Sequence, residues 1–169
     1  MPTNCQRLVA LFKRRKESEV ADFIPPDPSI EFPHPENASL FTRWKENARP
    51  GVPGFFGGYR SAAHTDLTPI LYGLIHDPAV RKGYAFGRPV MATPTGLVFA
   101  YAGGNHYIFL KLRQARFDDA RKDGGWFDPT YGEDWIEFRG GGRIGSSTGW
   151  KKAMVRWANI SYQDSLSIG

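Results

Sequence analysis

The sequence predicts an α+β fold: a small antiparallel sheet of about three to five strands, centred on a hairpin at residues 97–113, with helices packed on one face. Three observations predict it. Two β-rich runs flank a glycine–glycine–asparagine turn, and a later run alternates apolar and polar residues. Near the C-terminus, apolar residues recur at three- and four-residue steps, as in an amphipathic helix.

The N-terminal third contains two expected features. Leu8, Leu11 and Phe12 share a helical face and precede a run of four basic residues, which predicts a basic helix at about residues 6–20. Residues 25–58 are rich in proline and glycine, which interrupt regular structure, apart from a short helix in "ASLFTRWKENA". This segment is expected to wrap the core through its rings, Phe32, Trp44, Phe55, Phe56 and Tyr59.

The next expected element is a helix in "TDLTPILYGLIHDP", capped by Asp66 or Thr68 and stopped by Pro78. Residues 81–96 form a turn-rich passage with room for one short strand. The hairpin follows, with strands at 97–102 and 106–113. The first strand is apolar throughout, which is typical of the middle of a sheet.

The second hairpin strand alternates, with Tyr107 and Phe109 on one face and Ile108 and Leu110 on the other. A further strand is expected at "DWIEFRG", after an acidic excursion marked by turn signals. The last helix is predicted from about residue 149 to 162. Together these elements predict one domain spanning residues 1–169, a length at which a core forms without disulfides or metal.

Composition favours a soluble globular protein. Five Trp, seven Tyr and twelve Phe provide rings for a core or a binding surface. Cys5 is the single cysteine, so no intramolecular disulfide is possible, and a reducing, cytoplasmic location is expected. The longest apolar runs are too short for a membrane span, and the N-terminus does not resemble a secretory signal. No cofactor or metal site is predicted.

The net charge of +5 is unevenly distributed. Residues 1–16 and 139–163 carry basic residues without acids, and residues 118–137 are rich in acids. This asymmetry favours either an anionic partner or pairing of the acidic stretch with one basic end.

The stretch "RGGGRIGSSTGWKKA" at residues 139–153 has neither the spacing of a Walker loop nor that of a dinucleotide fingerprint. It is interpreted as a strand exit, a glycine turn and a Ser/Thr cap before a helix. An exposed helix N-terminus beside basic residues could still bind an anion. The candidate anion-binding residues are Arg143, Ser146, Ser147, Thr148, Lys151 and Lys152.

Candidate catalytic residues are His64, Asp66 and His106. His64 precedes a helix start and has Asp66 two residues away to orient it, and His106 follows the hairpin turn. If both imidazoles faced one cleft, they would form an acid–base pair. The sequence contains no G-x-S-x-G nucleophile elbow.

The basic C-terminal helix is a candidate nucleic-acid contact through Lys152 and Arg156, with Tyr107 and Phe109 able to stack on bases if exposed. The acidic stretch interrupts a continuous basic patch, and no known DNA-binding motif is legible.

The sequence therefore favours a soluble, non-enzymatic binding module, with a protein partner and an adaptor-, inhibitor- or immunity-like role. The alternatives are a hydrolase of a phosphate-containing substrate and a nucleic-acid-binding protein.

Overall fold

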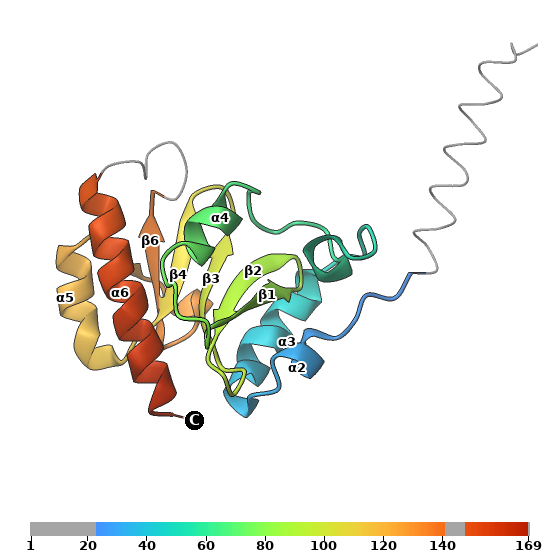
Figure 1. Ribbon diagram of the computed structural model, residues 1–169, viewed down its shortest axis with the longest axis horizontal. Coiled ribbons are helices and arrows are strands. Elements are labelled where there is room, and N and C mark those ends of the chain that lie inside the picture. The colour runs from blue at the N-terminus through green and yellow to red at the C-terminus, as the bar shows by residue number, and fades with distance from the viewer. Residues whose placement is uncertain (1–22, 141–147, 169) are drawn as a thin grey trace, which may run out of the picture.

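The computed structural model describes residues 23–140 and 148–168, and the structural statements that follow concern these residues (Figure 1). The expected basic helix at residues 6–20 lies outside them, as do Arg143, Ser146 and Ser147 of the candidate anion loop.

The described residues form a six-stranded antiparallel sheet with the order β1-β2-β3-β4-β6-β5. The α+β prediction is confirmed, but the predicted size of three to five strands is wrong. The strands are β1 (Arg81–Ala85), β2 (Arg88–Ala92), β3 (Val98–Gly103), β4 (Tyr107–Lys111), β5 (Gly125–Phe127) and β6 (Trp135–Arg139).

The hairpin of β1 and β2 was not predicted from the sequence, because the residues of its turn are unusual for a hairpin. β1 and β2 are joined by a two-residue turn in which both Phe86 (φ 49°) and Gly87 (φ 79°) have positive φ. Hairpin turns of this kind favour Asn-Gly, and an aromatic residue rarely adopts such a backbone. The Phe86 ring is buried against Phe41 and Tyr59, with centroid distances of 5.6 and 5.1 Å, and this packing offsets the backbone cost.

The hairpin itself is confirmed. β3 pairs with β4, with Tyr101 opposite Phe109 and Gly103 opposite Tyr107, and β3 lies inside the sheet with every residue buried. The register between β2 and β3 shifts next to Met91, so Phe99 faces the same side as its neighbour Ala100.

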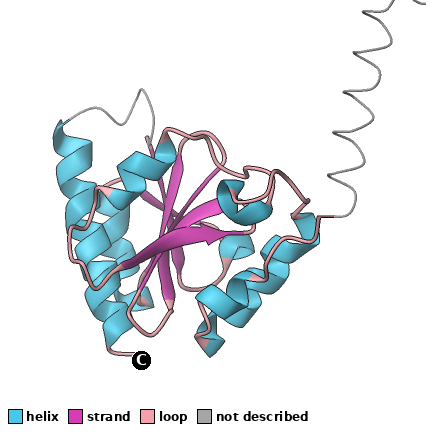
Figure 2. Ribbon diagram, turned by 45° about the vertical axis from the view of Figure 1, so that its right-hand side comes forward, coloured by secondary structure: helices cyan, strands magenta, loops and turns pink. Residues whose placement is uncertain are grey.

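Helices cover both faces of the sheet, so the prediction that they pack on one face is wrong (Figure 2). A fully apolar strand such as β3 exposes apolar side chains on both sides and therefore needs cover on both. One face packs against α4 (Leu67–Tyr72), α5 (Phe117–Lys122) and α6 (Thr148–Leu166), and the other against α2 (Pro28–Glu31) and α3 (Ala38–Asn47).

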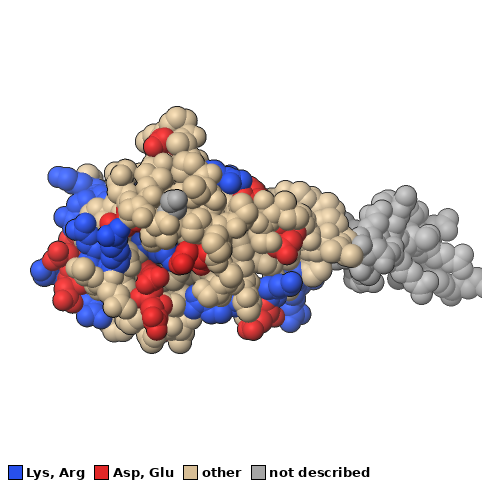
Figure 3. All heavy atoms as spheres, turned by 90° about the horizontal axis from the view of Figure 1, so that it is seen from below, with Lys and Arg blue, Asp and Glu red and all other residues tan. Residues whose placement is uncertain are grey.

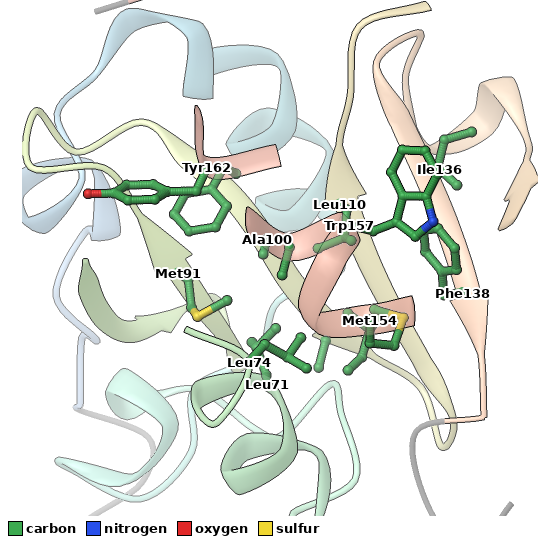
Figure 4. Packing of buried hydrophobic residues seen from close by; sticks show 14 of the residues in the cluster. Leu71, Leu74, Met91, Ala100, Leu110, Ile136, Phe138, Met154, Trp157 and Tyr162 are labelled. Carbon is green, nitrogen blue, oxygen red and sulfur yellow. The ribbon is translucent and has the colours of Figure 1, made fainter. Parts of the chain in front are cut away.

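We call the side covered by α4, α5 and α6 the packed face. Trp157 and Met154 of α6 lie over Ile136 and Phe138 of β6, and all four side chains are buried (Figure 4). On the same helix, the buried Ser161 Oγ lies 2.9 Å from the carbonyl oxygen of Phe99 and 2.7 Å from that of Lys111, so its single hydroxyl proton has two strand carbonyls as acceptors.

We call the opposite side the pocket face. Its cover begins in the proline-rich segment, which contains η1 (Pro35–Asn37) and η2 (Phe55–Gly58) in addition to α2 and α3. Phe32, Trp44 and Phe56 are buried, whereas Phe55 is 56% exposed. The buried Asn37 amide fixes the segment to the sheet. It donates to the carbonyls of Phe32 (3.0 Å) and Gly96 (2.8 Å) and accepts the N–H of Val98 (2.9 Å).

Two predicted helices have different bounds. α6 continues to Leu166, beyond the predicted end at about residue 162. α4 ends at Tyr72, before the predicted stop at Pro78, because Gly73 follows, and Asp66 makes no side-chain cap there. The acidic stretch that was expected to be an excursion contains η3 (Gln114–Arg116), α5, β5 and η4 (Pro129–Tyr131). Within the two described ranges, no helix combines the length and the apolar character needed to cross a membrane.

Candidate ligand-binding site

A pocket of about 300 Å³ opens on the pocket face, between α3 and the strands β2, β3 and β4. Its floor follows from the strand register. Tyr101 and Phe109 are cross-strand partners, and the next pair on the same face is Gly103 and Tyr107. Arg88 lies on β2 two residues before Val90, which pairs with Tyr101, and so continues the Gly103 row. The lining residues are Arg43, Trp44, Asn47, Arg88, Tyr101, Gly103, Gly104, Tyr107, Phe109, Thr130 and Tyr131.

Two short elements supply the sides of the pocket. Arg43, Trp44 and Asn47 lie at three- and four-residue steps on α3. On the other side, η4 presents Thr130 and Tyr131. The two sides are joined by Arg43, whose Nη1 donates to the Thr130 carbonyl at 3.1 Å.

The conformation of η4 is fixed locally. Asp128 Oδ1 accepts the Thr130 backbone N–H at 2.9 Å and its hydroxyl at 2.7 Å, and these bonds lower the pKa of the Asp128 carboxyl. The element ends at Gly132, which has φ 113° and lies so close to Arg43 that a Cβ would come within 2.8 Å of Nη2. The positive φ favours glycine at this position, next to the Arg43 guanidinium.

Arg88 presents a partly buried guanidinium to the pocket. The group lies over the Trp44 ring, 5.0 Å from its centroid, and burial lowers the pKa of Arg88 without removing its charge near neutral pH. Arg88 has neither an ion pair nor a hydrogen bond from its guanidinium to any described residue. Its described contacts are the Trp44 ring and an electrostatic interaction with Tyr101.

Tyr101 presents its hydroxyl to the same pocket. The residue as a whole is 2% exposed, and its ring stacks on Phe109 at 4.4 Å with an interplanar angle of 8°. Trp44 and Trp135 pack edge-on against it at 4.7 and 4.9 Å. Burial raises the pKa of Tyr101, so the hydroxyl stays protonated, yet it makes no hydrogen bond to the part of the chain that the structure describes.

The charge of the pocket is uncompensated. No Asp or Glu occurs among its described lining residues. Glu137, beneath the same face, is close enough to contribute to the raised pKa of Tyr101. Its carboxylate is already engaged, because Oε1 accepts from Arg139 Nε at 2.8 Å. The guanidiniums of Arg43 and Arg88 therefore face the cavity without a carboxylate partner.

The predicted catalytic residues lie elsewhere, at the turn between β3 and β4. The His64 N–H donates to the Gly104 carbonyl at 2.7 Å, which brings His64 to the same sheet edge as His106. His64 Nδ1 lies 3.6 Å from Asp66 Oδ2, and all three side chains are exposed. None of them lines the pocket, and the described residues contain no cluster of three metal-ligating side chains. Their catalytic role stays a prediction.

Of the predicted anion-binding residues, Thr148, Lys151 and Lys152 are described, and all are exposed in the first turn of α6. Arg156, predicted to contact nucleic acid, is bound within the chain, since it pairs with Asp123 and lies 4.8 Å from the Trp157 ring centroid. The face seen from below shows basic and acidic side chains interspersed over the described residues (Figure 3). Both roles stay predictions.

Sequence reasoning missed most of the pocket. Arg88, Tyr101 and Tyr131 were not singled out, and Trp44 was expected only as a core anchor. Tyr107 and Phe109 were singled out as stacking rings if exposed, but Phe109 is 3% exposed and Tyr107 is half-buried in the pocket lining. Strand alternation was the available signal, because it places Tyr107, Phe109 and Tyr101 on one face.

The fold and the site together define an α+β protein with a pocket lined by hydrogen-bond donors and rings. Comparison with known proteins adds no family to this description, because no family model, curated protein or solved structure matches the chain.

Proposed function

We propose that the protein is a soluble, non-enzymatic binding module that holds an anionic group of its partner in the pocket between α3 and the sheet. One observation supports this proposal above all. The Arg88 guanidinium and the Tyr101 hydroxyl line the same cavity, and neither donates a hydrogen bond to another described residue. The partner is a protein with an acidic group, and the setting is a reducing cytoplasm.

The Arg88 and Tyr101 donors line an open cavity without a protein acceptor, so a ligand can reach them. Hydrogen bonds in which one partner is charged contribute about 1.5–3 kcal/mol each. Two arginines around one cavity add mutual repulsion. A bound anion would accept from Arg43, Arg88 and Tyr101 together and relieve this repulsion.

Binding is favoured over catalysis by the chemistry of the lining. General acid–base catalysis needs a group whose pKa lies near the working pH. The described titratable groups here are arginines, which stay charged, and tyrosines, of which Tyr101 and Tyr131 have raised pKa values. Such groups hold and orient an anion without exchanging protons with it near neutral pH.

The test is anion binding to the full chain. Inorganic phosphate and sulfate are titrated while the side-chain Nε–Hε signals of the arginines are followed by NMR, with sodium chloride at equal ionic strength as the control. Saturable shifts of Arg88 and Arg43 are expected, together with a rise in thermal stability.

Arg88→Met should abolish these shifts. Arg81→Met is the matched control, because Arg81 also lies over a ring, 5.7 Å from the Phe32 centroid, outside the pocket. Shifts that only follow ionic strength, or that persist in Arg88→Met, would refute the proposal.

A hydrolase is the second candidate, favoured by the convergence of His64 and His106 on the β3–β4 turn. It predicts that His64→Ala and His106→Ala each lower phosphatase turnover on p-nitrophenyl phosphate by about 10²-fold or more with little change in stability. Absence of turnover by the unmodified chain would remove this candidate.

A further inference from the structure

We infer that the anion is carried on a flat aromatic ring, so that the ligand is an aryl carboxylate or an aryl phosphate, either free or as a side chain of a protein. This inference rests on the proposed function. Three features of the pocket argue for it: the kind of hydrogen-bonding groups it presents, the rings that surround it and the missing side chain at Gly103.

The charged groups of the pocket are all donors, although the Asn47 amide and the tyrosine hydroxyls can also accept. Arg43, Arg88 and Tyr101 supply N–H and O–H groups, and the Thr130 carbonyl, which could have served as an acceptor, is occupied by Arg43 Nη1. Ligands with exposed amino groups, such as nucleobases, need acceptors in the site. A carboxylate or a phosphate needs donors only, and guanidinium binds both with paired hydrogen bonds.

Rings form most of the remaining surface. Trp44, Tyr101, Tyr107, Phe109 and Tyr131 all line the cavity, and successive pairs pack with centroids 4.4 to 6.2 Å apart. A small inorganic anion would leave this aromatic surface facing water. An aromatic group on the ligand would pack against it edge-on or offset-stacked, the geometries that the neighbouring rings already use.

Gly103 leaves the edges of two stacked rings uncovered. Its neighbours on the same face of β3 and β4 carry the rings of Tyr101 and Tyr107, but Gly103 itself has no side chain. A Cβ built there would lie 3.3 Å from Phe109 Cε2 and 3.9 Å from Tyr101 Cε2, against the edges of these rings. The glycine therefore lets a ligand approach the ring edges, with Arg88 beside it on β2.

Four probes distinguish the contribution of the aromatic ring from that of the anionic group. They are phenyl phosphate, benzoate, cyclohexanecarboxylate and inorganic phosphate. Each is titrated into the full chain and followed by NMR. Phenyl phosphate is expected to bind at least tenfold tighter than inorganic phosphate, and benzoate at least tenfold tighter than cyclohexanecarboxylate. The shifted signals should be those of Arg88 and of the Tyr101 and Gly103 amides.

Covering the ring edges at Gly103 should reduce the preference for an aromatic ligand. Gly103→Ala is expected to weaken phenyl phosphate binding about tenfold and Gly103→Val further, because the new atoms lie against the Phe109 and Tyr101 ring edges. Gly103 does not have a positive φ, so either residue fits the backbone, and the alanine variant retains a test if valine perturbs the fold. Gly149→Ala is the matched control, since nothing lies within 4 Å of its Cβ position.

The outcomes are distinct. Equal affinity for phenyl phosphate and inorganic phosphate, or for benzoate and cyclohexanecarboxylate, overturns the aromatic ligand but leaves the anion-binding module standing. Binding by none of the four probes overturns both.

One further titration distinguishes a ring carried by a protein partner from a ring of a free small molecule. A phosphotyrosine peptide that binds at least tenfold tighter than phenyl phosphate assigns the ring to a protein partner. Equal affinities assign it to a free aryl anion.

Discussion

The two faces of one sheet differ in what their polar groups can reach. On the packed face, Trp157 Nε1 donates to Asp123 at 2.8 Å and the Ser161 hydroxyl bonds to a strand carbonyl. The same helix buries Asp164 Oδ2 and Ser165 Oγ without a hydrogen bond among the described atoms. On the pocket face, Tyr101 and Arg88 direct their donors into an open cavity. The polar groups of the packed face are closed off from any ligand, whereas those of the pocket face can reach one, and we attribute this difference to function.

The largest effect is expected on the packed face. Trp157→Ala should lower the free energy of unfolding by about 3–5 kcal/mol, because it empties a fully buried site over β6. Urea unfolding measures this loss. Trp157→Phe keeps most of the ring and loses the bond to Asp123, so it should cost about 1–2 kcal/mol. Anion affinity should be unchanged in Trp157→Phe, and a large change in affinity would show that the two faces are coupled.

Asn37 is a buried structural polar group of the pocket face, and its removal should also be costly. Asn37→Ala leaves the Phe32 and Gly96 carbonyls and the Val98 N–H without their partner, with an expected loss of about 2–4 kcal/mol. Urea unfolding of the variant and of the unmodified chain measures this loss in the free energy of unfolding. Asn159→Ala is the control, because its amide bonds only to Val155 on an exposed helix surface. Equal small losses in both variants would contradict the role given to Asn37.

The sequence predicted the hairpin and the facing of its residues because alternation with period two is a local property. It did not predict the pocket, for three physical reasons. Arg43 and Arg88 meet only through the packing of α3 on the sheet, which local patterns do not encode. Tyr101 lies in a strand that is apolar throughout, where a buried ring indicates core. Histidines suggest acid–base catalysis from the sequence alone, whereas two arginines in a basic protein predict no particular site.

The local sequence pattern also could not predict that helices cover both faces of the sheet. The apolar run of β3 indicated a central strand, and full burial on both sides follows from it. The helix that covers the second face, α3, was recognised from Leu40, Phe41 and Trp44, but nothing in its pattern says on which side of the sheet it packs.

Tyr72 and Tyr101 provide a further test of the difference between the two faces. Burial raises the pKa of both Tyr72 and Tyr101, but the Tyr72 hydroxyl donates to the Gly83 carbonyl at 2.5 Å, whereas the Tyr101 hydroxyl bonds to no described residue. Tyr72→Phe should therefore cost about 1 kcal/mol of stability. Tyr101→Phe should change stability by less than about 0.5 kcal/mol.

Only the Tyr101 variant should weaken phosphate binding, about three- to tenfold, as measured by NMR titration. A stability loss in Tyr101→Phe as large as that in Tyr72→Phe would mean that its hydroxyl has a structural role, and the contrast between the faces would fail.

The smallest effect concerns Asp128, which holds η4 against the pocket. Its folded pKa is lowered by the bonds from Thr130, so its contribution is present above its unfolded pKa of about 3.9 and is lost as pH falls through the folded value. Asp128→Ala should weaken sulfate binding about two- to threefold at pH 7, because Tyr131 is held less firmly. Sulfate keeps its charge between pH 3 and 8, so the affinity ratio between the unmodified chain and Asp128→Ala should fall toward one as the pH drops below 4. A ratio that stays constant with pH would mean that Asp128 does not act on the pocket through its carboxylate, and the rigidity of η4 would have to come from Arg43 and Gly132 alone.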